Sequence, residues 1–193
     1  MITAVAGGTA VIKAKTYNGK TASCTVNVSA APNSITLSAA RKTIGTGESI
    51  QLDYTLPAGT ASHSIIWSSS DESVATVKNG KVTASSANVG TTVITVTAFN
   101  GTSASCTVTV KNRPTEITLT ETDRQLVIGE TFDLGVAFLE DEASDKITWT
   151  SYNEDIATVD NGKVTAVGTG AVYVVARTFN GIAAKCRVAV KAQ

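Results

Sequence analysis

An internal repeat constrains this chain of 193 residues more than any other feature of its sequence. The segment Asn-Gly-Lys-Val-Thr-Ala at 79–84 recurs at 161–166, and Trp67 falls on Trp149 at the same offset. Beyond this block the offset drops by two residues, so that Cys106 falls on Cys186. A repeated sequence of this size indicates a repeated structural unit, so predicting the fold reduces to predicting one unit.

The first 31 residues match only the last part of this unit. Tyr17-Asn18-Gly19 falls on Phe179-Asn180-Gly181, and Cys24 falls on Cys186, without a gap. We therefore predict three domains: the C-terminal part of a truncated repeat at 1–31 and whole repeats at 32–112 and 113–193. The joints at 29–34 and 111–116 are short and contain one proline each. Such joints swing less than Gly/Ser linkers, which predicts an extended array with modest bending.

Within each unit, apolar and polar residues alternate with the period of half-buried strands. In the second copy the alternating apolar positions are Ile50, Leu52, Tyr54 and Leu56, and the last strand alternates through Cys106, Val108 and Val110. The chain contains 30 threonines and 22 valines, which favour strands. Each whole repeat is predicted to hold seven or eight short strands, as expected of a two-sheet sandwich.

Five Asn-Gly pairs separate these alternating runs, and they begin at Asn18, Asn79, Asn100, Asn161 and Asn180. Asn-Gly suits a type I′ turn, in which both central residues need positive φ, and is the strongest short-range hairpin signal. No stretch shows a sustained helical period. The fold class is therefore predicted to be all-β.

The order of motifs in each repeat resembles the bacterial immunoglobulin-like domain, group 2. The motifs are Ile-Thr-Leu, Gly-Glu, Trp-Ser/Thr-Ser, Ala-Thr-Val, Asn-Gly-Lys-Val-Thr-Ala and Ala-x-Cys-x-Val-x-Val. They cover 33–193, and the last three strands of the pattern fall within 1–31. The resemblance implies tandem immunoglobulin-like β-sandwiches in an extended array. It also implies a bacterial cell-surface or secreted protein, and it brings no shared catalytic or cofactor-binding residues.

Each copy has a single cysteine at an inward-facing position, so we expect reduced, buried thiols at Cys106 and Cys186. Trp67 and Trp149 are expected to pack in the sandwich cores, with exposed sugar-stacking platforms as the alternative. The aromatic residues before three of the turns (Tyr17, Phe99 and Phe179) are predicted either to shield a domain junction or to form an exposed contact surface.

The net charge of zero hides a gradient along the array. Residues 1–31 carry three lysines and no acid, 32–112 carry five bases and four acids, and 113–193 carry eight bases and twelve acids. In the acidic copy, a cluster of carboxylates forms a weak calcium candidate, because Ca²⁺ prefers oxygen ligands; its residues are Glu140, Asp141, Glu142 and Asp145. A solvated loop is the alternative.

Enzymatic, nucleic-acid-binding and membrane-spanning functions find no support in the sequence. His63 is the only histidine, so no Ser-His-Asp or Cys-His arrangement can form without it. No zinc spacing or phosphate-binding loop occurs, and no catalytic residue or cofactor is predicted. A neutral chain lacks the cationic surface of a nucleic-acid binder, and no apolar run approaches the roughly 20 residues of a membrane span.

Residues 1–31 cannot form a sandwich alone, since the strands that would cover Ile12, Cys24 and Val26 are missing from them. An isolated hairpin is marginal in water, and its open edges invite pairing. We therefore expect a piece of a longer protein in which this segment packs on its neighbour or self-associates with another copy of the chain.

The predicted function is a non-catalytic extracellular module array that acts as spacer and interaction scaffold on a bacterial surface. Its partners would be the neighbouring domains of the parent protein and a host surface protein or glycan. The alternative is a glycan-binding accessory region of a secreted polysaccharide-degrading enzyme, which a planar strip of exposed aromatic residues would favour. A phage or virion decoration domain is a third reading.

Overall fold

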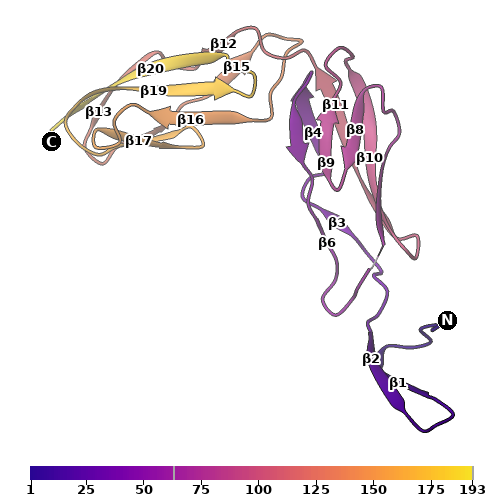
Figure 1. Cartoon of the computed structure of the whole chain (residues 1–193). Helices are drawn as coiled ribbons and strands as arrows, with labels where there is room; N and C mark the ends of the chain where they lie inside the picture. The colour runs from indigo at the N-terminus through magenta and orange to yellow at the C-terminus, as the bar shows by residue number, and fades with distance from the viewer. Residues whose placement is uncertain (63, 193) are drawn as a thin grey trace.

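The computed structural model describes residues 1–62 and 64–192, and these residues form strands and no helix. A β-hairpin is followed by two β-sandwiches that succeed one another along the chain (Figure 1). The predicted all-β array of immunoglobulin-like sandwiches is confirmed. His63 lies outside the described residues.

The first sandwich contains nine strands within the described residues, two more than the lower sequence-based count. They are β3 (Thr36–Leu37), β4 (Arg41–Gly45), β5 (Ser49–Gln51), β6 (Tyr54–Thr55), β7 (Ile65–Ser69), β8 (Ala75–Lys78), β9 (Lys81–Ala84), β10 (Gly90–Ala98) and β11 (Ser103–Lys111). One sheet has the order β4-β11-β10-β7, with β4 parallel to β11, and the other has the order β5-β9-β8. A two-stranded ribbon, β3-β6, completes the sandwich.

The second sandwich repeats this topology strand for strand. Its strands are β12 (Ile117–Leu119), β13 (Asp123–Val127), β14 (Thr131–Asp133), β15 (Val136–Phe138), β16 (Ile147–Ser151), β17 (Ala157–Asp160), β18 (Lys163–Ala166), β19 (Gly170–Thr178) and β20 (Ala183–Lys191). They form sheets β13-β20-β19-β16 and β14-β18-β17 with the ribbon β12-β15. The repeated sequence therefore folds into a repeated structure.

The core of each sandwich is built from the inward positions that the alternation predicts. In the first sandwich, Ile94, Cys106 and Val108 are fully buried, and their counterparts Val174, Cys186 and Val188 are fully buried in the second. Both cysteines are free thiols and both are buried, which confirms the prediction. Burial raises the pKa of each thiol. They therefore behave as small apolar residues of the core.

The two tryptophans pack on these cores without being fully enclosed. Trp67 and Trp149 are half-buried against the buried clusters of their own sandwiches. The six-membered ring of each indole also packs against the Asn-Gly turn of its repeat. A Cβ atom added at Gly80 or Gly162 would lie only 3.2 Å from Cζ2 of the tryptophan. The prediction that both tryptophans pack in the cores is thus confirmed, and they lie at the edge of each core.

The alternation over 50–56 does not correspond to one strand. Ile50 and Leu52 are buried in the first sandwich, but the chain then leaves that sheet, and Tyr54 in β6 pairs with Leu37 in β3. The Tyr54 side chain is 38% exposed, because the ribbon lies at the margin of the sandwich. A period of two continues across a change of sheet, so periodicity alone does not reveal the break.

Only two of the five Asn-Gly pairs form type I′ turns. Asn79 and Asn161 have φ of 51° and 49° and are followed by glycines of positive φ. In the hairpin loops that contain Asn18, Asn100 and Asn180, the asparagine does not have positive φ, and only the glycine that follows it does. There the glycine amide donates to the carbonyl three residues earlier, as in Gly181 to Thr178, which gives a three-residue loop. The predicted turn type is wrong at these three sites.

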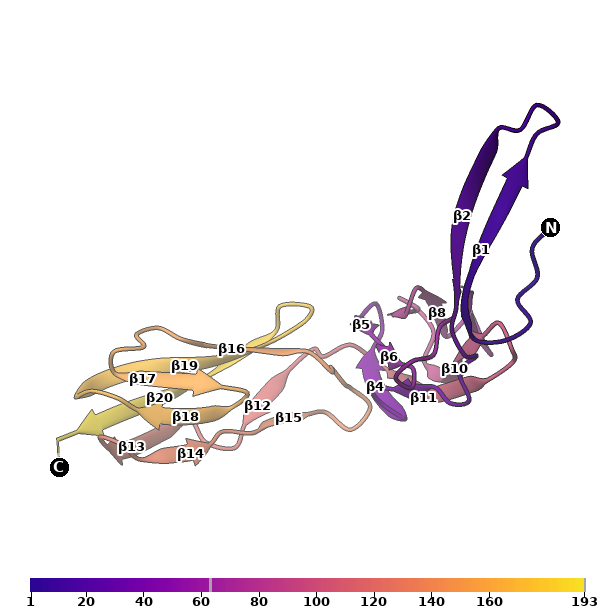
Figure 2. The same cartoon turned by 90° about the horizontal axis from the view of Figure 1, so that it is seen from below.

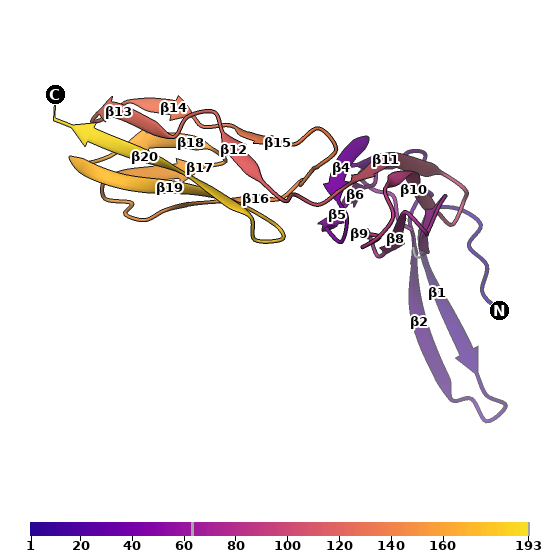
Figure 3. The same ribbon diagram turned by 90° about the horizontal axis from the view of Figure 1, so that it is seen from above.

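The N-terminal hairpin consists of β1 (Gly8–Lys15) and β2 (Thr21–Val28), and it projects from the first sandwich (Figure 2, Figure 3). Residues 1–7 precede it without forming the third strand that the sequence predicts. The counterpart strands, β9 and β18, are each paired on both sides within their sheets. Within the described residues, the hairpin forms a sheet of two strands only, so the prediction of a third strand is wrong.

Candidate functional site: the joint between the sandwiches

A buried carboxylate lies where the two sandwiches meet. Glu48 follows β4 at a tight corner and is 1% exposed, although an unpaired buried carboxylate would be costly. Within its own sandwich, a Glu48 carboxylate oxygen accepts from the Gly45 amide at 2.9 Å. The main-chain groups of Glu48 also bond to Gly45 and Ala84, which fixes the corner on β9. The carboxylate is thereby aimed at the second sandwich.

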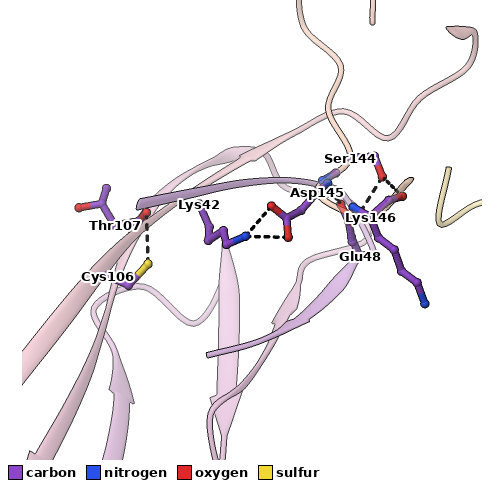
Figure 4. Close-up of polar contacts among 8 residues, drawn as sticks. Lys42, Glu48, Cys106, Thr107, Ser144, Asp145 and Lys146 are labelled. Atoms are coloured by element: carbon purple, nitrogen blue, oxygen red, sulfur yellow. Dashed lines mark hydrogen bonds and ion pairs between the residues drawn. The ribbon is translucent and has the colours of Figure 1, made fainter. Parts of the chain in front are cut away.

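The other partners of Glu48 come from the loop before β16. The Asp145 amide donates to one carboxylate oxygen at 3.1 Å, and the Lys146 amide donates to the other at 2.9 Å. The Ser144 hydroxyl lies 3.3 Å from the second oxygen (Figure 4). One carboxylate thus accepts main-chain hydrogen bonds from two sandwiches, and charged acceptors make such bonds stronger than neutral pairs.

Two lysines of the first sandwich add contacts around this centre. Lys42 forms an ion pair with Asp145, with Nζ 2.8 and 3.0 Å from the carboxylate oxygens. The Lys111 ammonium donates to the Glu140 carbonyl at 2.8 Å. The side chains of Lys42 and Asp145 are about one-third exposed, so solvent screens this pair. The two lysines therefore add solvent-exposed contacts between the sandwiches around the buried carboxylate of Glu48.

Close packing at Gly45 completes the joint. A Cβ atom at Gly45 would lie 2.5 Å from the Ala143 carbonyl oxygen, 2.9 Å from Cε1 of Phe179 and 3.1 Å from Cα of Arg113. The Arg113 amide also donates to the Thr46 hydroxyl at 3.1 Å, and Thr46 is buried. Only glycine leaves room for this approach. Phe179 therefore shields the junction, whereas Phe99 and Tyr17 are 49% and 103% exposed.

The linker itself is held by the sandwich that follows it. The Asn180 side-chain amide donates to the Pro114 carbonyl at 2.8 Å, and the Asn112 amide donates to the Asp141 carbonyl at 3.0 Å. The same contact occurs one repeat earlier, where Asn100 donates to the Pro32 carbonyl at 2.8 Å. The three-residue hairpin loops thus position asparagines that tie down the linker prolines.

The second sandwich carries the same corner in different surroundings. The Val127 amide donates to a Glu130 carboxylate oxygen at 2.8 Å, as the Gly45 amide does to Glu48. Glu130 is exposed, however, and no residue of another sandwich contacts it among the described residues. Valine and isoleucine, Val127 and Ile128, stand where the first corner has Gly45 and Thr46. The two corners share a fold but not an environment.

The acidic cluster of the calcium prediction lies at this joint. The Asp145 carboxylate is paired with Lys42, and Glu142 accepts from the amide and hydroxyl of Thr115. The Thr115 hydroxyl lowers the pKa of Glu142. Within the described part of the chain, no three carboxylate, thiol or imidazole groups converge as metal ligands. Calcium binding stays a prediction, which titration calorimetry with Ca²⁺ tests.

Cys106 and Cys186 lie in the cores of the two sandwiches. The raised pKa values of Cys106 and Cys186 keep these thiols protonated, and each donates to the carbonyl of the next residue. Neither group is therefore placed as a nucleophile. Searched over the described residues, the chain has no helix long and apolar enough to cross a membrane.

Sequence reasoning missed Glu48, Gly45 and Lys42 as site residues. The available signal was the Gly-Glu pair, which recurs as Gly129-Glu130 and sits between two strands in both copies. The repeat showed that the pair mattered to the unit. Its role in a joint depends on partners almost one hundred residues away, which the local pattern does not specify.

Comparison with known proteins yields a match over most of the chain. The model of a family described as bacterial Ig-like domain (group 2) matches residues 31–108 and 114–185. These two segments fall within the two sandwiches and leave the hairpin unmatched.

Individual relatives are matched over limited parts of their length. An uncharacterized protein of Clostridium acetobutylicum is 34% identical over 140 residues, which are 68% of this chain and 14% of that protein. The minor capsid protein of Enterobacteria phage T3 is 44% identical over 79 residues, 41% of this chain and 18% of that protein. The solved surface layer protein SbsC, domains 1-6, has a TM-score of 0.35 and 15% identity over 97% of this chain and 35% of its own. The chain therefore spans less than one-fifth of either curated relative.

Proposed function

Because this chain belongs to the bacterial immunoglobulin-like domain (group 2) family, we propose that it is a non-catalytic extracellular spacer whose sandwiches are held in a fixed mutual orientation. The observation that carries the proposal is the burial of Glu48 between two sandwiches. A flexible tether would not need a buried carboxylate, a glycine contact and anchored linker prolines at one joint. A spacer that presents a terminal binding region at a set distance does need them.

The hydrogen-bonding pattern supports stiffness at this joint. Rotating the second sandwich away would leave the Asp145 and Lys146 amides without Glu48 and would open the Gly45 contact. Losing hydrogen bonds to a charged group costs about 1.5–3 kcal/mol per bond, which strongly favours one orientation. The domain boundaries at 31/32 and 112/113 stay predictions, and the joint lies across the second of them.

Small-angle X-ray scattering of the full chain tests the proposal. We expect one conformation of the two sandwiches to account for the scattering profile, with the same maximum dimension at low and high salt, because Glu48 is shielded from solvent. A profile that requires a broad set of mutual orientations would contradict a fixed-orientation spacer.

The glycan-binding alternative has a specific surface to examine. Tyr152 and Tyr173 are 70% and 38% exposed, and Lys185 lies over the Tyr173 ring. The two rings meet at 68° with centroids 6.4 Å apart, so they form no planar strip. Trp67 and Trp149 pack on the cores, which further disfavours sugar stacking. The phage T3 likeness favours the virion-decoration reading as a second setting for the same spacer role.

A further inference from the structure

One face of the second sandwich differs in chemistry from the same face of the first. Strands β16, β19 and β20 lie side by side in the second sandwich (Figure 1). Their inward residues Val174 and Cys186 are fully buried, as are the counterparts Ile94 and Cys106 in the first sandwich. The outward positions between these residues do not belong to the core, so the core does not restrict which side chains they carry.

The outward face of the second sandwich carries aromatic and cationic side chains. They belong to Tyr152, Tyr173, Arg177 and Lys185. The counterparts in the first sandwich are uncharged and not aromatic, and they are Ser70, Val93, Thr97 and Ser105. The first sandwich forms the same four-stranded sheet with these residues. The sheet therefore does not require the aromatic and cationic side chains of the second sandwich.

Contacts across the strands order these side chains. The Lys185 ammonium lies over the Tyr173 ring, 4.5 Å from its centroid. The Tyr152 and Tyr173 rings meet edge to face, with their centroids 6.4 Å apart. Edge-to-face ring pairs and cation–π contacts are both favourable. They hold the Tyr152 ring and the Lys185 ammonium in place before any ligand arrives.

Val175 forms the base of an open hollow on this face. It is only 5% exposed, although it lies on the outward side of β19. The hollow has a volume of about 180 Å³, and its other lining residues are Tyr152, Arg177, Ala183, Ala184 and Lys185. Tyr152 is 70% exposed, so most of its side chain is accessible. An apolar base, an accessible ring and two cations thus surround one small volume.

The two cations of the hollow have no acidic partner in the described part of the chain. The ion pairs there involve neither Arg177 nor Lys185, and no carboxylate lines the hollow. Arg177 Nη1 donates to the Gly181 carbonyl at 2.9 Å, and a guanidinium has further N–H groups for a ligand. The hollow is positive although residues 113–193 carry eight bases and twelve acids. It therefore favours an anionic group.

We propose that this hollow binds one acidic sugar residue of a glycan, a hexuronate. The sugar carboxylate accepts from the Arg177 guanidinium and the Lys185 ammonium. The C–H groups of the sugar ring pack on the Tyr152 ring. One acidic residue needs one aromatic ring, and not the planar strip that a neutral glycan chain would use. The inference does not depend on the spacer role, which is a property of the joint.

The composition of the hollow favours a sugar over other anions. An acidic side chain of a peptide would neutralise the cations but would leave the accessible Tyr152 ring uncovered. A nucleic acid would need a cationic track along successive phosphates, whereas Arg177 and Lys185 are two cations in an acidic repeat. An acidic sugar at an end or branch of a glycan matches both the charge and the ring.

Three small probes separate the contributions of charge and ring. Methyl glucuronide carries both, methyl glucoside has the same ring without the carboxylate, and N-acetylglutamic acid α-amide has a carboxylate without the ring. Each is titrated into the full chain while backbone amide resonances are followed by NMR. We expect methyl glucuronide to shift Val175, Arg177 and Lys185 and to bind about tenfold more tightly than either other probe, because each of them lacks one favourable contact.

The outcomes of this titration decide the proposal. Equal binding of the glucoside would show that the cations take no part, and equal binding of the glutamate probe would assign the hollow to acidic peptides. Either result, or no shift at high millimolar glucuronide, would overturn the proposal. None of these results bears on the orientation of the two sandwiches, so the spacer role is tested separately.

A charge substitution with a matched control locates the site. Arg177→Gln removes one cation from the hollow and should weaken glucuronide binding about tenfold, because a hydrogen bond to a charged group is lost. Lys163→Gln removes the same charge from β18, in the opposite sheet, and should leave binding unchanged. Equal weakening by both substitutions would show general attraction of an anion and overturn the proposal.

Substitutions of Tyr152 test the role of the ring. Tyr152→Ser copies Ser70, which the first sandwich carries at this position, so we expect the fold to be kept and glucuronide binding to be lost. Tyr152→Phe keeps the ring and should retain most of the affinity. If Tyr152→Ser bound methyl glucuronide as tightly as the wild type, the ring would take no part and the proposal would be overturned.

Discussion

The corners at Glu48 and Glu130 have the same backbone and the same internal hydrogen bond, yet only one is buried. Around Glu48, glycine and threonine admit the next sandwich, whose loop amides satisfy the carboxylate. Around Glu130, Val127 and Ile128 occupy the corresponding positions. The two corners therefore keep one internal hydrogen bond but differ in burial and in the two residues beside it.

Removing the carboxylate should separate the two corners most clearly. Glu48→Ala leaves the Asp145 and Lys146 amides unpaired, and we expect the first sandwich to lose about 3 kcal/mol of unfolding free energy. Glu130→Ala should cost the second sandwich about 1 kcal/mol, because one exposed hydrogen bond is lost. Urea denaturation followed by Trp67 fluorescence in a Trp149→Phe background, and the converse, measures each effect. Equal losses would contradict the difference in environment.

Exchanging the residue beside the carboxylate sharpens the comparison. Gly45→Val copies Val127 into the joint, where its Cβ would meet the Ala143 carbonyl and Phe179. Overpacking of this kind costs about 1–3 kcal/mol, and here opening the joint relieves it. We expect faster amide hydrogen exchange at Asp145 and Lys146 with a folded first sandwich. Val127→Gly serves as the reciprocal control and should leave those amides protected.

A smaller effect is expected at the second residue of the corner. Thr46→Val removes the hydroxyl that accepts from the Arg113 amide while keeping the side-chain volume. The lost hydrogen bond should cost about 1 kcal/mol, measured by the same urea denaturation. Thr46→Ser keeps the hydroxyl and should retain most of the stability. If Thr46→Val had the same free energy of unfolding as the wild type, the hydrogen bond from the Arg113 amide to Thr46 would not stabilise the joint.

The smallest effect concerns pH. The pKa of Glu142 is lowered because its carboxylate accepts from Thr115. Its contribution to stability is therefore complete above the pKa of a glutamate in the unfolded chain and is lost as pH falls through the lower pKa of the folded chain. Glu142→Gln should flatten the acid side of the stability profile slightly. An unchanged profile would show that the exposed Thr115 contact contributes nothing measurable.

The sequence correctly predicted the features that depend on the two-residue alternation of strands and on the internal repeat. Alternation placed Cys106 and Cys186 in the cores, and the repeat predicted equivalent sandwiches, because side chains two residues apart share a face. It predicted the wrong turn type at Asn18, Asn100 and Asn180, since Asn-Gly fits two loop lengths with different φ values. It also missed the role of Glu48, whose partners lie in another repeat.

The prediction for the aromatic turn residues shows the same limit. Tyr17, Phe99 and Phe179 occupy one position of the unit, and the sequence left junction and surface roles open for all three. Phe179 lies beside Gly45 because a sandwich precedes it at the right distance. Phe99 and Tyr17 are more exposed in their own surroundings. Residues that are equivalent within a unit therefore lie in different surroundings in this chain.

Residual dipolar couplings of the full chain test the central claim, that Glu48 fixes the orientation of the two sandwiches. We expect one alignment tensor to fit both sandwiches in the wild type and in Glu130→Gln. In Glu48→Gln, each sandwich should require its own tensor, with different magnitudes. A single shared tensor in Glu48→Gln, or separate tensors in the wild type, would contradict the account.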